Sequence, residues 1–79
     1  MYFVGDIPNE KCKASLYRWN GKFFLKFETP DMEQTFKISE TDVSGEEEVK
    51  AFVTEEFLEK VVKRFESMYQ DMGEALNGF

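Results

Sequence analysis

The chain has 79 residues, a formal net charge of −6 and thirteen aromatic residues, but only one cysteine and no histidine. Its length predicts a single domain spanning residues 1–79, the lone Cys12 excludes an intrachain disulfide, and the aromatic content argues against disorder. Without histidine or a glycine-rich phosphate loop, we expect no metal ion, no cofactor, no small-molecule ligand and no catalytic activity.

Residues 1–10 are predicted to form an N-terminal segment that leads into a loop. Tyr2-Phe3-Val4 is apolar and is a candidate edge strand, whereas Gly5 to Asn9 is rich in turn residues. The apolar run ends at Gly5-Asp6, so we expect neither a signal peptide nor a membrane span. A single cysteine and no export signal predict a cytoplasmic protein.

Residues 11–38 are predicted to form a three-stranded antiparallel meander. Asn20-Gly21 lies between two runs that alternate in polarity, and Asn-Gly is the strongest short signal for a two-residue hairpin turn. A second turn is expected at Thr29-Pro30-Asp31-Met32, because proline presets φ. The predicted strands cover residues 11–19, 22–28 and 33–38.

The hairpin turn also predicts the register, and with it the two faces of the sheet. A two-residue loop pairs Tyr17 with Phe24 and Leu16 with Leu25, and the second turn then pairs Leu25 with Phe36. The expected core face comprises Cys12, Ala14, Leu16, Phe23, Leu25, Phe27, Phe36 and Ile38. On this face, Cys12 is expected to act as a small apolar side chain rather than a nucleophile.

Residues 45–72 are predicted to be helical, with residues 73–79 forming a loose tail. Ser44-Gly45-Glu46-Glu47 matches a capping box that starts a short helix over residues 45–53. Thr54 is a second candidate N-cap, and the apolar residues on its two sides point in different directions, so a break is expected there. Gly73 is predicted to occupy the C′ position that ends the long helix.

The resulting fold class is α+β: a three-stranded meander, with a possible fourth N-terminal edge strand, then a short helix and a long amphipathic helix packed on one sheet face. The same register places three aromatic residues on the opposite face, surrounded by lysines. The candidate partner-binding residues are Tyr17, Trp19, Phe24, Lys22, Lys26 and Lys37. Three covers for this face are open: residues 45–53 or Tyr2 and Phe3 of the same chain, a second copy in a homodimer, or a different partner.

We therefore expect a small non-catalytic protein-interaction module, self-associating through the sheet face opposite the long helix. One alternative is an acidic inhibitor or adaptor of a larger protein, of the kind encoded in short bacterial and phage reading frames. Another is a weak binder of single-stranded nucleic acid that uses the sheet aromatics and lysines. The net negative charge disfavours nucleic acid as the partner.

Overall fold

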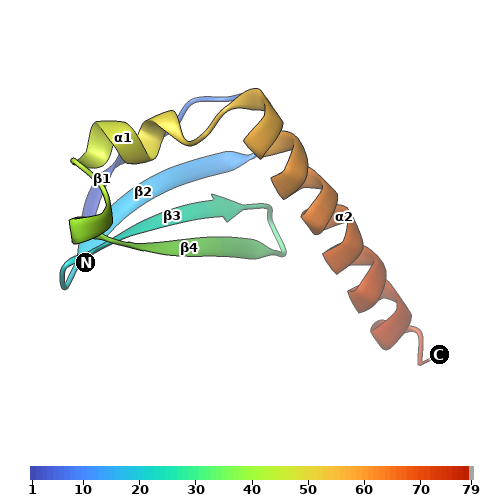
Figure 1. Cartoon of the computed structure of the whole chain (residues 1–79). Coiled ribbons are helices and arrows are strands. Elements are labelled where there is room, and N and C mark those ends of the chain that lie inside the picture. The colour runs from blue at the N-terminus through green and yellow to red at the C-terminus, as the bar shows by residue number, and fades with distance from the viewer. Residues whose placement is uncertain (79) are drawn as a thin grey trace.

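A computed structural model describes residues 1–78 and confirms an α+β fold with a β-meander (Figure 1). Four antiparallel strands form one sheet in the order β1-β2-β3-β4. A 3₁₀ turn and two helices follow. The elements are β1 (Tyr2–Asp6), β2 (Lys13–Trp19), β3 (Lys22–Glu28), β4 (Glu33–Ser39), η1 (Glu40–Asp42), α1 (Glu46–Ala51) and α2 (Glu55–Leu76).

The Asn20-Gly21 turn sets the register of the central hairpin as predicted. Asn20 has φ 52° and Gly21 has φ 76°, which are the positive values that a type I′ turn requires at both central positions. Tyr17 consequently pairs with Phe24, and Leu16 pairs with Leu25. The predicted alternation of side chains between the two sheet faces is therefore confirmed for β2 and β3.

The second turn is held by the backbone and side chain of Thr29. Its N–H donates to the carbonyl of Met32 at 2.9 Å, and its Oγ1 accepts from the N–H of Met32 at 3.0 Å. This turn brings β4 into the expected register, with Phe36 opposite Leu25. Both turns thus direct the same set of apolar side chains to one face, as the sequence predicts.

The candidate edge strand at the N-terminus is present as β1 and pairs with β2. Phe3 lies opposite Tyr17 and Gly5 opposite Leu16, so the register shifts at Val4 in a β-bulge. The following loop is held by Asn9, whose side-chain oxygen accepts from the N–H groups of Lys11 and Cys12. Because these two N–H groups bond to Asn9 within the loop, β2 begins at Lys13, two residues later than predicted.

The hydrophobic core lies between one sheet face and the two helices. Val49 of α1 is fully buried in this core, together with residues of β2, β3 and α2. Residues 45–53 therefore cover the core face, and the alternative in which they fold over the opposite aromatic face is wrong. The buried apolar residues are Ala14, Leu16, Phe23, Leu25, Phe27, Val49, Leu58, Val61 and Phe65.

The break between the helices occurs where the sequence predicts it. Thr54 is the N-cap of α2, and its side chain accepts from the N–H of Phe57 at 3.1 Å. The start of α1 differs from the prediction: Gly45 is the N-cap, and the carboxylate that reaches back is that of Glu48, not Glu47. Glu48 accepts from the backbone N–H of Ser44 at 3.0 Å and from its hydroxyl at 2.9 Å.

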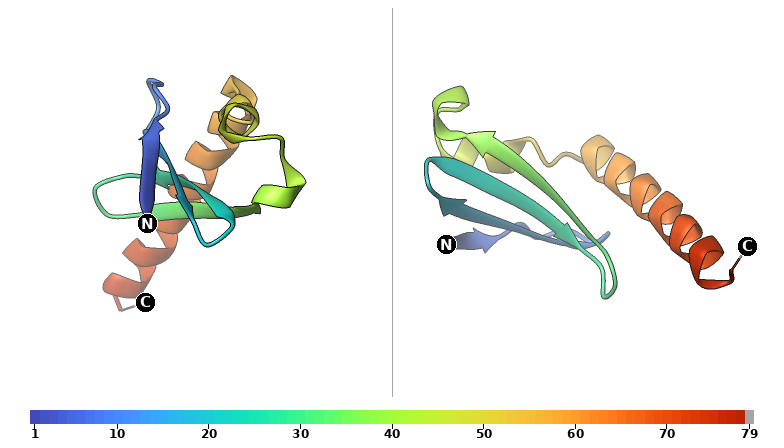
Figure 2. Two further views of the ribbon diagram at one scale, coloured as in Figure 1. Left: turned by 90° about the vertical axis from the view of Figure 1, so that its left-hand side faces the viewer. Right: turned by 90° about the horizontal axis from the view of Figure 1, so that it is seen from below.

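The long helix packs on the core face through its first half and then extends past the sheet (Figures 1 and 2). In Figure 1, α2 does not follow the strands but descends steeply past their ends beside the turn that joins β3 to β4, and its 22 residues span about 33 Å. Moreover, α1 already occupies one end of the face. The second half of α2 therefore has no sheet beneath it.

The predicted end of this helix at Gly73 is wrong. Gly73 is helical, and α2 continues to Leu76. Asn77 is the C-cap, with its N–H donating to the Gly73 carbonyl at 3.1 Å, and Gly78 has φ 65°. The left-handed glycine after the helix is thus Gly78, five residues later than predicted. Of the predicted loose tail, residues 73–76 are helical, and Phe79 lies outside the described residues.

A candidate interaction surface on the open sheet face

The sheet face that points away from α1 carries a continuous row of aromatic side chains. We call this side the open face, and we call Phe3, Tyr17 and Phe24 the aromatic row. They are successive cross-strand partners on β1, β2 and β3, and Lys37 of β4 continues the row. The rings of Phe3 and Tyr17 have centroids 5.3 Å apart, a separation at which aromatic pairs attract one another.

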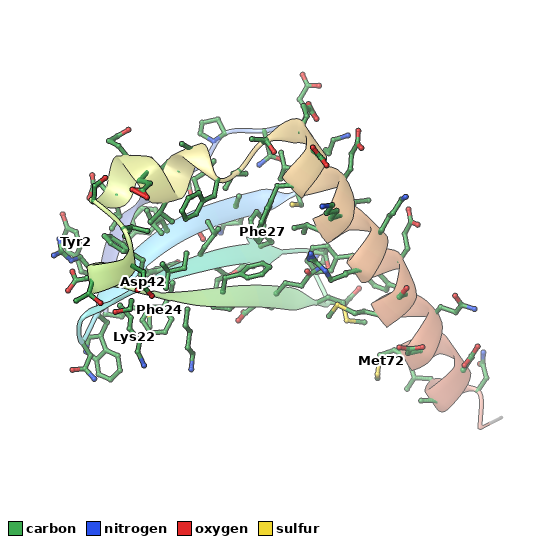
Figure 3. The ribbon with its side chains drawn as sticks, viewed as in Figure 1. Tyr2, Lys22, Phe24, Phe27, Asp42 and Met72 are labelled. Carbon is green, nitrogen blue, oxygen red and sulfur yellow. The ribbon has the colours of Figure 1, made fainter. Side chains whose placement is uncertain are left out.

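Trp19 adds the largest exposed side chain to this face. It lies at the end of β2, pairs with Lys22, and is 55% exposed. Figure 3 shows Lys22 and Phe24 on the side of the sheet away from α1, whereas Phe27 points toward the helices. Small soluble proteins seldom leave several large aromatic side chains together at the surface without a use for them.

Two lysines lie over the rings of the aromatic row. The Nζ atom of Lys26 is 5.3 Å from the centroid of Tyr17, and that of Lys37 is 5.9 Å from the centroid of Phe24. Both distances fit cation–π attraction. The strand pairing places all six residues predicted from sequence on this face. Three of them, Tyr17, Phe24 and Lys37, lie directly opposite one another on β2, β3 and β4.

Charge is unevenly distributed over the open face. At one end, Lys26 lies 3.4 Å from Glu28 and 3.5 Å from Glu33. Desolvation lowers the pKa of Lys26, but hydrogen bonds and Coulombic attraction from the two glutamates together outweigh it and raise the pKa above its usual value. At the aromatic end, neither Lys22 nor Lys37 has a carboxylate of residues 1–78 within 4.0 Å.

Phe3 is the residue of this surface that the sequence analysis did not assign to it. The candidate edge strand was recognised from its apolar composition, and Phe3 was considered only as a cover for the aromatics. In the structure Phe3 lies beside Tyr17 in the next strand and widens the row. The bulge at Val4 changes the alternation along β1, so that a simple two-residue period could not have placed Phe3.

Cys12 contributes no evident reactive group. Its side chain is half-buried against the core, and burial raises the pKa of the thiol, which keeps it in the neutral form. Within residues 1–78, no three cysteine, aspartate or glutamate side chains are grouped so that they could hold a metal ion. None of the described helices combines the length and the apolar character that crossing a membrane requires.

Comparison with known proteins adds no relative: neither a family model, nor a curated protein, nor a solved structure matches the chain.

Proposed function

We propose that this chain is a small non-catalytic interaction module whose open face binds a second copy of the chain. The observation that carries the proposal is the aromatic row, with Trp19 at its side, on a sheet face that no helix of residues 1–78 covers. Phe3 and Trp19 are exposed, and the other two aromatic residues of this surface are half-buried. Aromatic anchors surrounded by polar side chains are characteristic of the centres of protein interfaces. Closed two-fold dimers are the commonest assemblies that such a surface forms.

The small size of the domain favours the same conclusion. A chain of 79 residues buries only about 60% of its unfolded surface, so association is a common source of additional stability. The single cysteine does not provide a disulfide within the chain. Its reduced thiol fits a cytoplasmic setting.

A protein partner fits the surface better than single-stranded nucleic acid does. Bases bind to such sheets by stacking on open aromatic faces. Such binding also needs lysines that can neutralise phosphates, and here Lys26 is already paired with Glu28 and Glu33. The net charge of −6 further opposes a polyanion.

The proposal is tested by measuring mass in solution with light scattering or sedimentation. We expect about twice the 9.3 kDa mass of the chain. The double variant Trp19→Lys, Phe24→Lys should return the mass to that of one chain while circular dichroism stays unchanged. A wild-type protein that remains monomeric at several hundred micromolar would overturn the proposal.

A matched control separates the loss of the surface from the general effect of adding lysine. Phe52 is also an exposed aromatic residue, at 41%, but it follows α1 on the other side of the molecule. Phe52→Lys should leave the dimer intact. If it dissociated the dimer as effectively as the open-face variant, the open face would not be the contact surface.

A further inference from the structure

The second half of α2 carries an apolar stripe that leaves the core and becomes exposed toward the C-terminal end of the helix. We call residues 65–76 of α2 the arm. The stripe starts at the buried Phe65, which is 4% exposed, and continues through the half-buried Met68. Met72 is 46% exposed and Leu76 is 79% exposed. The helical spacing of the core residues thus persists for about two turns past Met68, where the side chains have no core of residues 1–78 to pack against.

A groove runs beside this stripe, between the arm and the turn that joins β3 to β4. Its volume is about 540 Å³, and it is lined by Asp31, Met32, Tyr69, Met72, Gly73 and Leu76. The turn and the arm are tied together by Tyr69, whose hydroxyl lies 2.6 Å from the Thr29 hydroxyl. The groove is large enough to receive an aromatic side chain.

The arm and the aromatic end of the open face have opposite charge. Residues 65–78 contain three acids and no base, and on the helix Glu66 and Asp71 flank the apolar stripe on its two sides. The aromatic end of the open face instead presents Lys22 and Lys37 with no carboxylate of residues 1–78 within 4.0 Å. An apolar stripe with acidic flanks matches an aromatic row with basic flanks.

The same charges disfavour a dimer in which two open faces meet directly with aromatic end against aromatic end. In that arrangement the lysines of one copy would approach the lysines of the other, and like charges across an interface are costly. The shape of the molecule favours the alternative. α2 starts on the core side of the sheet and descends to the level beyond its open face, as Figure 1 and the left view of Figure 2 show. Figure 3 shows Met72 of the arm at one end of the sheet and Lys22 and Phe24 at the other. A two-fold rotation that brings two open faces together in opposite directions therefore places the arm of each copy beside the aromatic end of the other.

We propose that, in the dimer, the arm of each copy lies across the open face of the other copy. The contact occurs twice around one two-fold axis, because each copy supplies an arm and a face. Met72 and Leu76 would lie against the partner's aromatic row, and the acids of the arm would face the partner's lysines. This inference depends on the proposed function, since it specifies which element binds to the open face.

The first test changes the arm alone. Met72→Lys, Leu76→Lys replaces two exposed side chains and should weaken dimerisation at least tenfold, about 1.4 kcal/mol, without loss of helix content. The control is Ser67→Lys, Gln70→Lys, which adds the same charge to exposed positions on the opposite side of the helix. The control should change the dissociation constant by less than about threefold, because those residues lie away from the stripe.

The second test exchanges charges between the two surfaces. Lys22→Glu, Lys37→Glu should weaken the dimer, and Glu66→Lys, Asp71→Lys should also weaken it. Combining all four substitutions should restore most of the affinity, because the charge pattern across the interface is then complementary again. Restoration requires that the two sets of residues meet between copies.

The outcomes separate this inference from the proposed function. A dimer that is lost on Trp19→Lys, Phe24→Lys but is indifferent to the arm variants, with no restoration on charge exchange, would overturn the inference and leave the proposed function standing. A monomeric wild-type protein would overturn both. Loss of the dimer in the arm variant, with retention in its control and restoration on charge exchange, would establish the inference.

Discussion

The rings of Phe27 and Phe57 join the sheet to the long helix, with their centroids 5.7 Å apart. Phe27 is fully buried on β3 and Phe57 is half-buried in the first turn of α2. Phe36 of β4 completes the cluster, with its centroid 5.5 Å from that of Phe57. Because only the first half of α2 rests on the sheet, this cluster carries a large part of the attachment of the helix.

Phe57→Ala is therefore expected to lower the free energy of unfolding by about 2 kcal/mol, less than a fully buried phenylalanine would cost. Chemical denaturation monitored by circular dichroism measures this change. Glu59→Ala, at an exposed position of the same helix, should change stability by less than about 0.5 kcal/mol. Equal effects of the two substitutions would contradict a role for the cluster in holding α2.

Two glycines should respond to alanine in opposite directions. Gly21 has φ 76° in the hairpin turn, and an alanine there is strained by about 1 kcal/mol. Gly73 is helical, and a Cβ atom at this position would meet no atom within 4 Å. Gly73→Ala should therefore raise the free energy of unfolding by about 1 kcal/mol.

The pair of glycine variants also tests where α2 ends. Both are measured by urea denaturation at the same protein concentration. If Gly73→Ala were destabilising, as it would be for a left-handed C′ glycine, the helix would end there and the arm would be shorter than described. A stabilising effect is what a continuous helix to Leu76 requires.

Ser15 is a buried polar residue in the otherwise apolar middle of β2. It is 1% exposed, and its hydroxyl oxygen has no hydrogen-bond partner among residues 1–78. Burying an unpaired hydroxyl is unfavourable, so Ser15→Ala should be neutral or should stabilise the fold by up to about 1 kcal/mol. Thermal and urea unfolding measure the effect, and a loss of more than about 1 kcal/mol would show that the hydroxyl is satisfied in solution.

The sheet could be predicted from sequence because its determinants are local. The Asn20-Gly21 turn requires positive φ at both positions, and a two-residue loop then leaves a single register for β2 and β3. The Tyr17–Phe24 pair follows directly from it. Six residues could therefore be assigned to the open face from the sequence alone.

The parts that could not be predicted depend on non-local geometry. The place of Phe3 depends on the bulge at Val4, and a bulge has no signal in the alternation of polarity. The sequence also marks Val49 and Met72 as apolar helical positions of the same kind. Only the position of each helix relative to the sheet decides that Val49 of α1 is buried while Met72 of α2 is exposed.

The start of α1 should depend on pH through Glu48. Hydrogen bonds from the N–H and hydroxyl of Ser44 lower the pKa of this carboxyl in the folded protein. Because the folded pKa lies below the unfolded one, about 4.3 for glutamate, the stabilising contribution is present above that pH. It is lost as the pH falls through the folded pKa.

Glu48→Gln should accordingly be less stable than the wild type at pH 7, and the difference should vanish toward pH 2. Urea denaturation at a series of pH values measures both curves. Glu46→Gln removes the same charge from the first turn of α1 without removing a contact to Ser44, so it controls for net charge and for the helix dipole. If Glu46→Gln were as much less stable than the wild type at pH 7 as Glu48→Gln is, with the same disappearance toward pH 2, the effect would come from charge at the helix terminus. The Ser44–Glu48 hydrogen bonds would then not be its cause.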